Sequence, residues 1–281
     1  MIESSGPGAR PPLPMELLFE AGGGPTASLP AKLEELYGGG LELPRPILYS
    51  NFVTSLDGVA VLGPSSGSTL SGNSQADRFV MGLLRSCADA ILIGSGTLRG
   101  SPGHVWTAEH VYPPSASEFR TLRRQLGLPE HPTLVIASGS GAIDLTHPGL
   151  ARPAVLLTTE AGRRRLGPAG PHEVVVLGPG PELDPAAMTE TLRQAGHAQI
   201  LTEGGPRLQG QLLRAGQLDQ LFLTLSPLLA GRTDESRRAG FVDGVDLLAD
   251  GRRSWLSLLS ARRSQSHLFL RYQVRAGASP A

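Results

Sequence analysis

Two glycine-rich turns, far apart in the sequence, carry the residue types best suited to binding a phosphorylated ligand. An apolar run at 88–93 ends in Gly-Ser-Gly-Thr at 94–97, and a second run at 199–202 ends in Glu-Gly-Gly-Pro at 203–206. Glycines let backbone amides approach a ligand closely, and a helix beginning after such a turn presents unpaired N–H groups to phosphate. Turns at the carboxyl ends of parallel strands form the ligand crevice of an open α/β sheet. The sequence therefore predicts a nucleotide-cofactor site.

Polar side chains accompany both turns. Thr97 and Arg99 offer a hydroxyl and a guanidinium beside the first turn, and both groups suit phosphate. Glu203 follows a buried strand, where a carboxylate is costly unless it has a partner. Two interpretations of Glu203 remain open at this stage: it caps nearby backbone amides, or it binds hydroxyl or amide groups of a substrate.

Composition excludes several other kinds of site. Lys32 is the only lysine, so neither a lysine-bearing phosphate loop nor a Schiff-base lysine in the body of the protein is expected. Cys87 is the only cysteine, which excludes an intramolecular disulfide and a multi-thiolate metal site. No His-Glu-x-x-His pair occurs. We expect no metal.

Charge and hydropathy give expectations about partners and location. The formal net charge is +0, and the densest basic cluster, 163–165, is expected in a solvated loop rather than a nucleic-acid footprint. No apolar run has the length of a membrane span. We therefore expect a cytoplasmic protein that binds a small molecule and contacts neither nucleic acid nor membrane.

The pattern of apolar residues predicts alternating strands and helices. Strands are expected at 47–53, 88–93, 133–137, 154–158, 173–177, 199–202 and 217–225, and helices at 74–87, 117–126, from 184 and from 208. A flap or loop is expected at 100–115, and an antiparallel pair at 255–259 and 267–274. Thr54 and Ser55 follow the first strand and could line the crevice.

These elements predict an α/β fold with a mixed, mostly parallel sheet, helices on both faces and a C-terminal antiparallel hairpin. The 281 residues can bury one large core or two small ones. We expect one domain at 45–275 and a short tail at 276–281. The leader at 1–44, with a short amphipathic stretch at 29–37, either packs on the body or is partly flexible.

In order and spacing, several segments together resemble a known family. These are Val-Thr-Ser-Leu-Asp-Gly at 53–58, Leu84-Arg85 through the turn at 94–97, the turn at 203–206, and the segments 218–221 and 225–231. They resemble the reductase domain of riboflavin biosynthesis, the C-terminal domain of the bifunctional pyrimidine deaminase–reductase, in its stand-alone form. The resemblance covers residues 45 to 275. It implies a dihydrofolate-reductase-like fold, NADPH as hydride donor and a homodimer.

The resemblance also implies roles for individual residues. Arg78 matches an arginine that holds the substrate phosphate, and Glu203 would bind substrate. Cofactor contacts fall on Thr54, Gly94, Gly96, Thr97, Ser138, Gly204, Gly205, Pro206, Arg207 and Leu208, and the wrap around the phosphates continues through Gln209, Gly210 and Gln211. The implied reaction delivers hydride to ribose C1′ of a phosphorylated ribosylaminopyrimidine.

One departure from the family bears on the substrate. Ser101 stands where the family has an aspartate facing cofactor and substrate, so Ser101 is the expected substrate-side residue and no proton donor is named. Two alternatives remain: a pterin or folate-like reductase of the same fold, and a non-catalytic nucleotide-binding relative.

Overall fold

The computed structural model describes residues 13–22, 29–63, 69–233, 238–249 and 254–276. The elements in chain order are β1 (Glu16–Glu20), α1 (Ala31–Tyr37), β2 (Ile47–Thr54), α3 (Gln75–Cys87), β3 (Ala90–Gly94), α4 (Ser95–Gly100), α5 (Ala108–Val111), η1 (Pro113–Ser115), α6 (Ala116–Gln125), β4 (Thr133–Ser138), η2 (Pro148–Leu150), β5 (Val155–Thr158), α7 (Glu160–Leu166), β6 (Glu173–Val176), α8 (Pro185–Gln194), β7 (Gln199–Thr202), α9 (Pro206–Arg214), β8 (Gln220–Leu225), β9 (Ser254–Ser264) and β10 (His267–Ala276).

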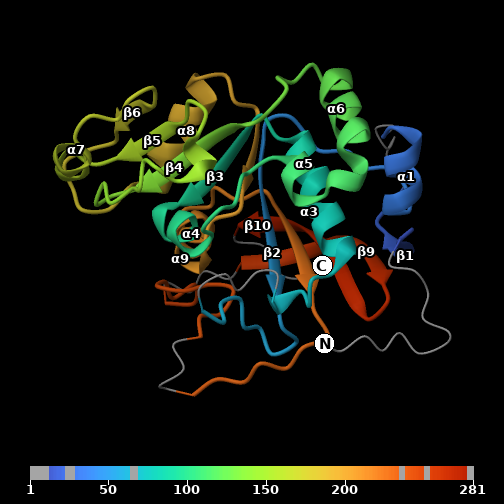
Figure 1. Cartoon of the computed structure of the whole chain (residues 1–281). Helices are drawn as coiled ribbons and strands as arrows, with labels where there is room; N and C mark the ends of the chain where they lie inside the picture. The colour runs from blue at the N-terminus through green and yellow to red at the C-terminus, as the bar shows by residue number, and fades with distance from the viewer. Residues whose placement is uncertain (1–12, 23–28, 64–68, 234–237, 250–253, 277–281) are drawn as a thin grey trace.

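The described strands form a single mixed sheet (Figure 1) in the order β1-β9-β10-β8-β2-β7-β3-β4-β5-β6. In the part of this order that runs β8-β2-β7-β3-β4-β5-β6, each strand is parallel to its neighbours. The remaining pairs are antiparallel: β10 with β8, β10 with β9, and β1 with β9. The chain builds β2 to β6 first and then returns to place β7 between β2 and β3. The expected mostly parallel sheet with a C-terminal antiparallel hairpin is confirmed.

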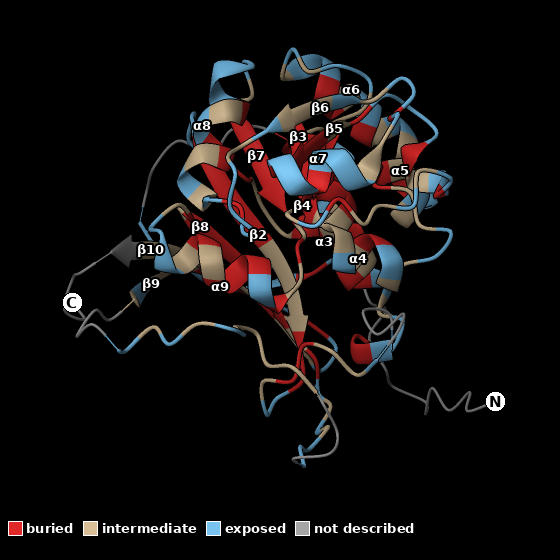
Figure 2. Ribbon diagram, turned by 90° about the vertical axis from the view of Figure 1, so that its left-hand side faces the viewer, coloured by how far each residue is buried: buried red, intermediate tan, exposed pale blue. Residues whose placement is uncertain are grey.

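Both faces of the sheet are covered, because successive side chains of a strand point to opposite faces. On β3, Ile91 and Ile93 join the core cluster that contains residues of α1, α3 and α6, whereas Leu92 joins the cluster that contains residues of α8 and α9. Figure 2 shows the buried central strands between helices with exposed outer surfaces. A sheet buried on both faces explains the continuous apolar runs in the sequence.

Helix α3 contributes residues to the cavity described below, and it spans nearly the range predicted for a helix, 74–87. The Ser74 side chain accepts a hydrogen bond from Asp77 N at 3.3 Å and caps the first turn. Gly82 allows α6 to pack closely, since a Cβ there would come within 2.7 Å of the Phe119 ring. The helix is therefore fixed at its start and along its length.

Arg123 holds the other end of α3. Its guanidinium, 2% exposed, donates to the carbonyl oxygens of Ala88 at 2.7 Å, Arg85 at 3.1 Å and Pro129 at 2.7 Å. Burial lowers the Arg123 pKa from its usual value. One buried cation thus satisfies the carbonyls where α3 ends and β3 begins.

Several local expectations differ from the structure. The arginines at 163–165 are exposed as expected but lie on α7 rather than in a loop. The segment 100–115 contains α5 and η1, and β9 extends to Ser264 because its polar end is paired on both sides by β1 and β10. The structure also has β1, which was not expected.

The described part of the segment 1–44 is in contact with the body. β1 pairs with β9, and Leu33 and Tyr37 of α1 belong to the core cluster of α3. Residues 1–12 and 23–28 of the expected leader lie outside the described residues, as does the expected tail from 277 on; Ala276 ends β10.

We predict that Arg123→Met lowers the free energy of unfolding by about 2–4 kcal/mol, because buried carbonyls lose a charged donor. Urea denaturation measures this change. The control is Arg124→Met on the exposed side of α6, the helix that also carries Arg123. Its free energy of unfolding should stay within about 0.5 kcal/mol of the parent. Equal effects of the two substitutions would contradict a structural role for the Arg123 contacts.

Candidate functional site

A cavity of about 1010 Å³ lies at the carboxyl ends of β2, β3 and β7. Both glycine-rich turns open onto it, because β3 and β7 are adjacent, with Leu92 opposite Thr202. β7 enters the sheet between two strands made much earlier in the chain, so the strand order reverses here. Ligands of open α/β sheets bind at such a reversal.

The two turns leave backbone donors free for a ligand. α4 begins after Gly94 and α9 after Gly205, and neither cap residue provides a side-chain hydrogen bond. The first-turn N–H groups of a helix have no intrahelical partner. A Cβ added at Gly94 or Gly96 would meet nothing within 4 Å, so both positions face open cavity.

A buried hydroxyl beside these turns also lacks a partner. Ser138, at the end of β4, is 4% exposed, and its Oγ has no hydrogen bond to any described residue. The residue lines the cavity together with Gly139 and Ser140. An unsatisfied hydroxyl next to glycine turns and open helix N-termini fits the diphosphate and ribose groups of a dinucleotide.

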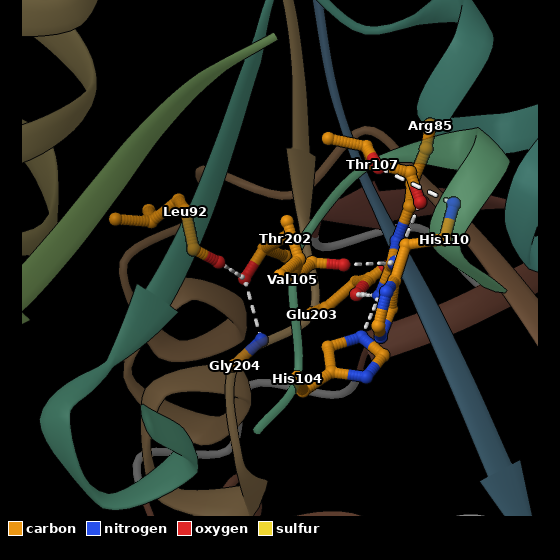
Figure 3. A network of polar contacts seen from close by, with 9 residues as sticks. All are labelled: Arg85, Leu92, His104, Val105, Thr107, His110, Thr202, Glu203 and Gly204. Atoms are coloured by element: carbon orange, nitrogen blue, oxygen red, sulfur yellow. Dashed lines mark hydrogen bonds and ion pairs between the residues drawn. The ribbon is translucent and has the colours of Figure 1, made fainter. Parts of the chain in front are cut away.

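The floor of the cavity holds a buried ion pair (Figure 3) between Arg85 of α3 and Glu203 after β7. Arg85 Nε donates to Glu203 Oε1 at 2.9 Å, and Nη2 donates to Oε2 at 2.7 Å. The two side chains are 1% and 9% exposed. The geometry is the parallel two-bond pairing that guanidinium and carboxylate prefer.

The remaining N–H groups of Arg85 hold the loop between α4 and α5. Nη1 donates to the carbonyl oxygens of Thr107 at 3.1 Å and Val105 at 3.4 Å, and Nη2 lies 2.9 Å from His104 Nε2. Burial, followed by the charge of Arg85, lowers the His104 pKa to about 3. His104 is therefore neutral at physiological pH.

His147 holds the same loop from the opposite side. Its Nδ1 accepts from Gly149 N at 3.0 Å, so the proton is on Nε2, which donates to Ser101 O at 3.0 Å. The buried Trp106 lies between, with ring centroids 5.8 Å from His147 and 4.9 Å from His104. Segment 101–106 is thus a fixed wall of the cavity.

A second carboxyl group lies at the start of α3. Asp77 lines the cavity although it is only 5% exposed, and the Thr224 and Ser71 hydroxyls hydrogen-bond to it. Burial raises the Asp77 pKa from its usual value. Arg78, the next residue, also lines the cavity, and its Nη2 donates to Asn73 Oδ1 at 3.2 Å.

Most residues that the sequence predicted for the site line this one cavity. They are Arg78, Gly94, Gly96, Thr97, Arg99, Ser101, Ser138, Glu203, Gly204, Gly205, Pro206, Arg207, Leu208 and Gln211. Glu203 is paired with a guanidinium, an arrangement that neither sequence interpretation included.

A few predicted residues lie elsewhere. Thr54, at the end of β2 opposite Leu225, is 2% exposed and is not among the lining residues. Ser55 Oγ donates to Asp57 Oδ1 at 2.5 Å and so belongs to the next turn. Gln209 is buried and donates to Ser50 Oγ at 3.2 Å, and Gly210 packs against Val245, so neither faces the cavity.

The sequence did not single out Arg85, His104 or Asp77 as site residues. In the sequence, Arg85 belongs only to the Leu84-Arg85 motif that contributes to the family resemblance. A signal existed for Asp77, which adjoins the apolar stripe of α3, where burial demands a partner. Arg85 lies on the opposite side of the helix, beside Arg78, and its position in the pattern gave no such signal. His104 gave no such signal in a segment without a period.

A comparison with known protein families shows to which family the chain belongs. The family described as "RibD C-terminal domain" matches residues 46–258. The chain belongs to this family. The resemblance to the reductase domain of riboflavin biosynthesis that the sequence predicted is thereby confirmed.

Solved structures similar to this RibD C-terminal domain protein share its fold. A pyrimidine reductase-like protein from Corynebacterium diphtheriae has a TM-score of 0.64 at 22% identity, over 82% of this chain and 92% of that one. Acinetobacter baumannii RibD has a TM-score of 0.62 at 18% identity, over 82% of this chain but 58% of its own. The riboflavin biosynthesis reductase Rib7 of Saccharomyces cerevisiae has a TM-score of 0.54 at 15% identity, over 87% and 98%.

Two further findings concern sequence similarity to curated proteins and the presence of membrane-spanning helices. No curated protein has significant sequence similarity to the chain. Within the described residues, no helix has the length and apolarity needed to cross a membrane.

For this RibD C-terminal domain protein we predict that Glu203→Gln lowers the free energy of unfolding by about 3–5 kcal/mol, since Arg85 keeps a buried, uncompensated charge. Chemical denaturation measures the loss. Arg85→Met combined with Glu203→Gln should cost clearly less than the sum of the two single changes, because both charges are gone. Additive losses would mean that the pair is not coupled.

Proposed function

We propose that this protein is an NADPH-dependent reductase that acts on a phosphorylated ribosylaminopyrimidine of the riboflavin-pathway type. The observation that carries the proposal is one cavity that joins two phosphate-binding turns to the Arg85–Glu203 pair and to Arg78. Membership of the RibD C-terminal domain family and the reductase-named structures of the same fold support a pyrimidine reductase.

The dinucleotide fits the end of the cavity formed by β3, β4 and β7. The first-turn amides of α4 and α9 would hold its diphosphate, and the unpartnered Ser138 Oγ would bind a polar group beside it. Arg99 and Arg207, exposed at the rim, are the cations available to a 2′-phosphate. NADPH supplies hydride when bound.

The substrate would occupy the end formed by α3 and the loop 101–106. Arg78 would hold its phosphate, and the Glu203 carboxylate, oriented by Arg85, would accept hydrogen bonds from polar groups near the reacting carbon. In the reaction the ribosylamine ring opens to an imine. C1′ then gains hydride and the nitrogen gains a proton, which gives the ribitylamino product. Water in this open cavity is the proton source we propose.

Asp77 gives a specific reason to keep a second candidate, a pterin or folate-like reductase. The residue lines the cavity at the substrate end, and a carboxyl group there can hydrogen-bond with the amino and ring nitrogens of an aminopyrimidine edge. The same edge occurs in a pterin. The choice between these ring systems therefore depends on the rest of the ligand, above all on its phosphate.

Oligomeric state and location complete the proposal: a cytoplasmic homodimer. The apolar stretch at 218–225 offers no free interface, because it supplies buried side chains of the chain's own core, Leu218, Leu221 and Phe222 among them. The homodimer rests on the family resemblance.

We predict that the protein binds NADPH more tightly than NADH. We also predict that Gly96→Val abolishes binding, because the new side chain fills the open space beside the first glycine turn where the diphosphate would bind. Titration by nicotinamide fluorescence measures both effects. Gly96→Ala, which adds one methyl group, should give an intermediate loss. Gly204 is less suitable for this test, because a Cβ there would lie 2.5 Å from the Leu208 side chain and would disturb the turn itself. Normal NADPH binding by Gly96→Val would exclude this turn as the place where the diphosphate binds.

We predict NADPH oxidation with a phosphorylated ribosylaminouracil in a panel that also contains its dephosphorylated form and a dihydropterin. Arg78→Ala should raise KM for the phosphorylated substrate by the equivalent of about 1.5–3 kcal/mol, the value of a hydrogen bond to a charged group. Its NADPH affinity should not change. The control is Arg120→Ala, an exposed position on α6. Turnover of the dihydropterin alone would select the second candidate, and no turnover at all would indicate a non-catalytic relative.

A further inference from the structure

His104 presents one ring edge to the cavity from the loop where this chain departs from its family. The residue is half-buried, lines the cavity, and packs edge-to-face on Trp106 with ring planes at 80°. Its position is therefore set by packing as well as by Arg85. Figure 3 shows the ring beside the Arg85–Glu203 pair.

The hydrogen bond with Arg85 determines which ring nitrogen carries the proton. A guanidinium can only donate, so His104 Nε2, 2.9 Å from Arg85 Nη2, must accept. The imidazole is neutral, and its single N–H is therefore on Nδ1. Arg85 cannot turn away, because its other N–H groups are held by Glu203, Val105 and Thr107.

This Nδ1–H has no acceptor among the residues that the structure describes. The ring's nearest aromatic neighbour besides Trp106 is the exposed His110, whose centroid is 5.1 Å away and which makes a ring contact rather than a hydrogen bond. The donor is thus fixed in direction and in tautomer, and the open side of His104 is the cavity.

We propose that His104 is a specificity-determining residue that donates its Nδ1–H to an acceptor atom of the substrate's heterocycle, a carbonyl oxygen or an unprotonated ring nitrogen. This rests on the proposed function in that the substrate occupies this end of the cavity. A ligand with an amino group at that point is rejected, because two donors face each other. The tautomer cannot reverse to accommodate it without placing an N–H against Arg85.

Two substitutions separate the two nitrogens. His104→Gln places an amide oxygen near the Nε2 position, which keeps the Arg85 contact and removes the donor. His104→Asn places an amide nitrogen near the Nδ1 position, which keeps the donor and removes the Arg85 contact. Calorimetric binding of the phosphorylated ribosylaminouracil, its KM, NADPH affinity and thermal midpoint are measured for both variants and the parent.

We expect His104→Gln to weaken substrate binding about tenfold, the value of one hydrogen bond, with NADPH affinity and thermal midpoint near those of the parent. His104→Asn should bind substrate within about threefold of the parent but unfold at a lower temperature, since Arg85 loses an acceptor. The shape of the pH–rate profile should be the same in the parent and in His104→Gln, because the residue stays neutral.

Three results would overturn the inference. The first is equal substrate binding by His104→Gln and the parent. The second is a loss of NADPH affinity, which would assign the donor to the cofactor. The third is an ionisation in the parent profile that disappears in His104→Gln, which would make His104 an acid or base. A parent protein that neither binds nor reduces any member of the panel would instead overturn the proposed function.

Discussion

The site depends on one buried interaction, the pairing of Arg85 with Glu203. Each of the five N–H groups of Arg85 has an acceptor: the two carboxylate oxygens, two backbone carbonyls and His104 Nε2. An ion pair removed from water is tolerated only when its remaining hydrogen-bonding groups are also satisfied. The pair therefore constrains α3, the end of β7 and the loop 104–107 to a single relative position. It also explains why a carboxylate can stand at the end of a buried strand.

The sheet makes this pairing possible by bringing together residues that are 118 positions apart. β7 enters the sheet between β2 and β3, and Glu203 N donates to Leu92 O at 3.2 Å, so Glu203 leaves the sheet beside the first glycine turn. Thr202 Oγ1 also donates to Leu92 O and accepts from Gly204 N. The phosphate-binding turns and the polar floor are thus two parts of one strand junction. A shift of β7 would displace both.

The parts of the fold that could be predicted from the sequence are those determined by residue patterns within a few positions. The two turns, α3 with its Ser74 cap, and the strands of the parallel sheet could be predicted, because apolar runs that end in glycine report on burial and on turns within a few residues. β1 could not, since Glu16–Glu20 is exposed throughout and exists through its pairing with β9. α7 was not predicted, because the cluster of exposed arginines at 163–165 indicated a solvated loop. The partner of Glu203 and the tautomer of His104 depend on contacts between distant segments, and a single sequence carries no record of those.

The pairing of β1 with β9 has a consequence for how the chain folds. The family match begins at residue 46, yet Glu16 lies opposite Arg263 and Glu20 opposite Ser260, with an ion pair between Arg262 and Glu20 at 2.9 Å. β1 therefore leaves the ribosome long before its partner β9 has been synthesised. Closing so long a loop costs only slightly more entropy than closing a shorter one, but contacts between distant segments slow folding. Until β9 is synthesised, the N-terminal strand has no partner, and the growing sheet has an open edge that another chain could occupy.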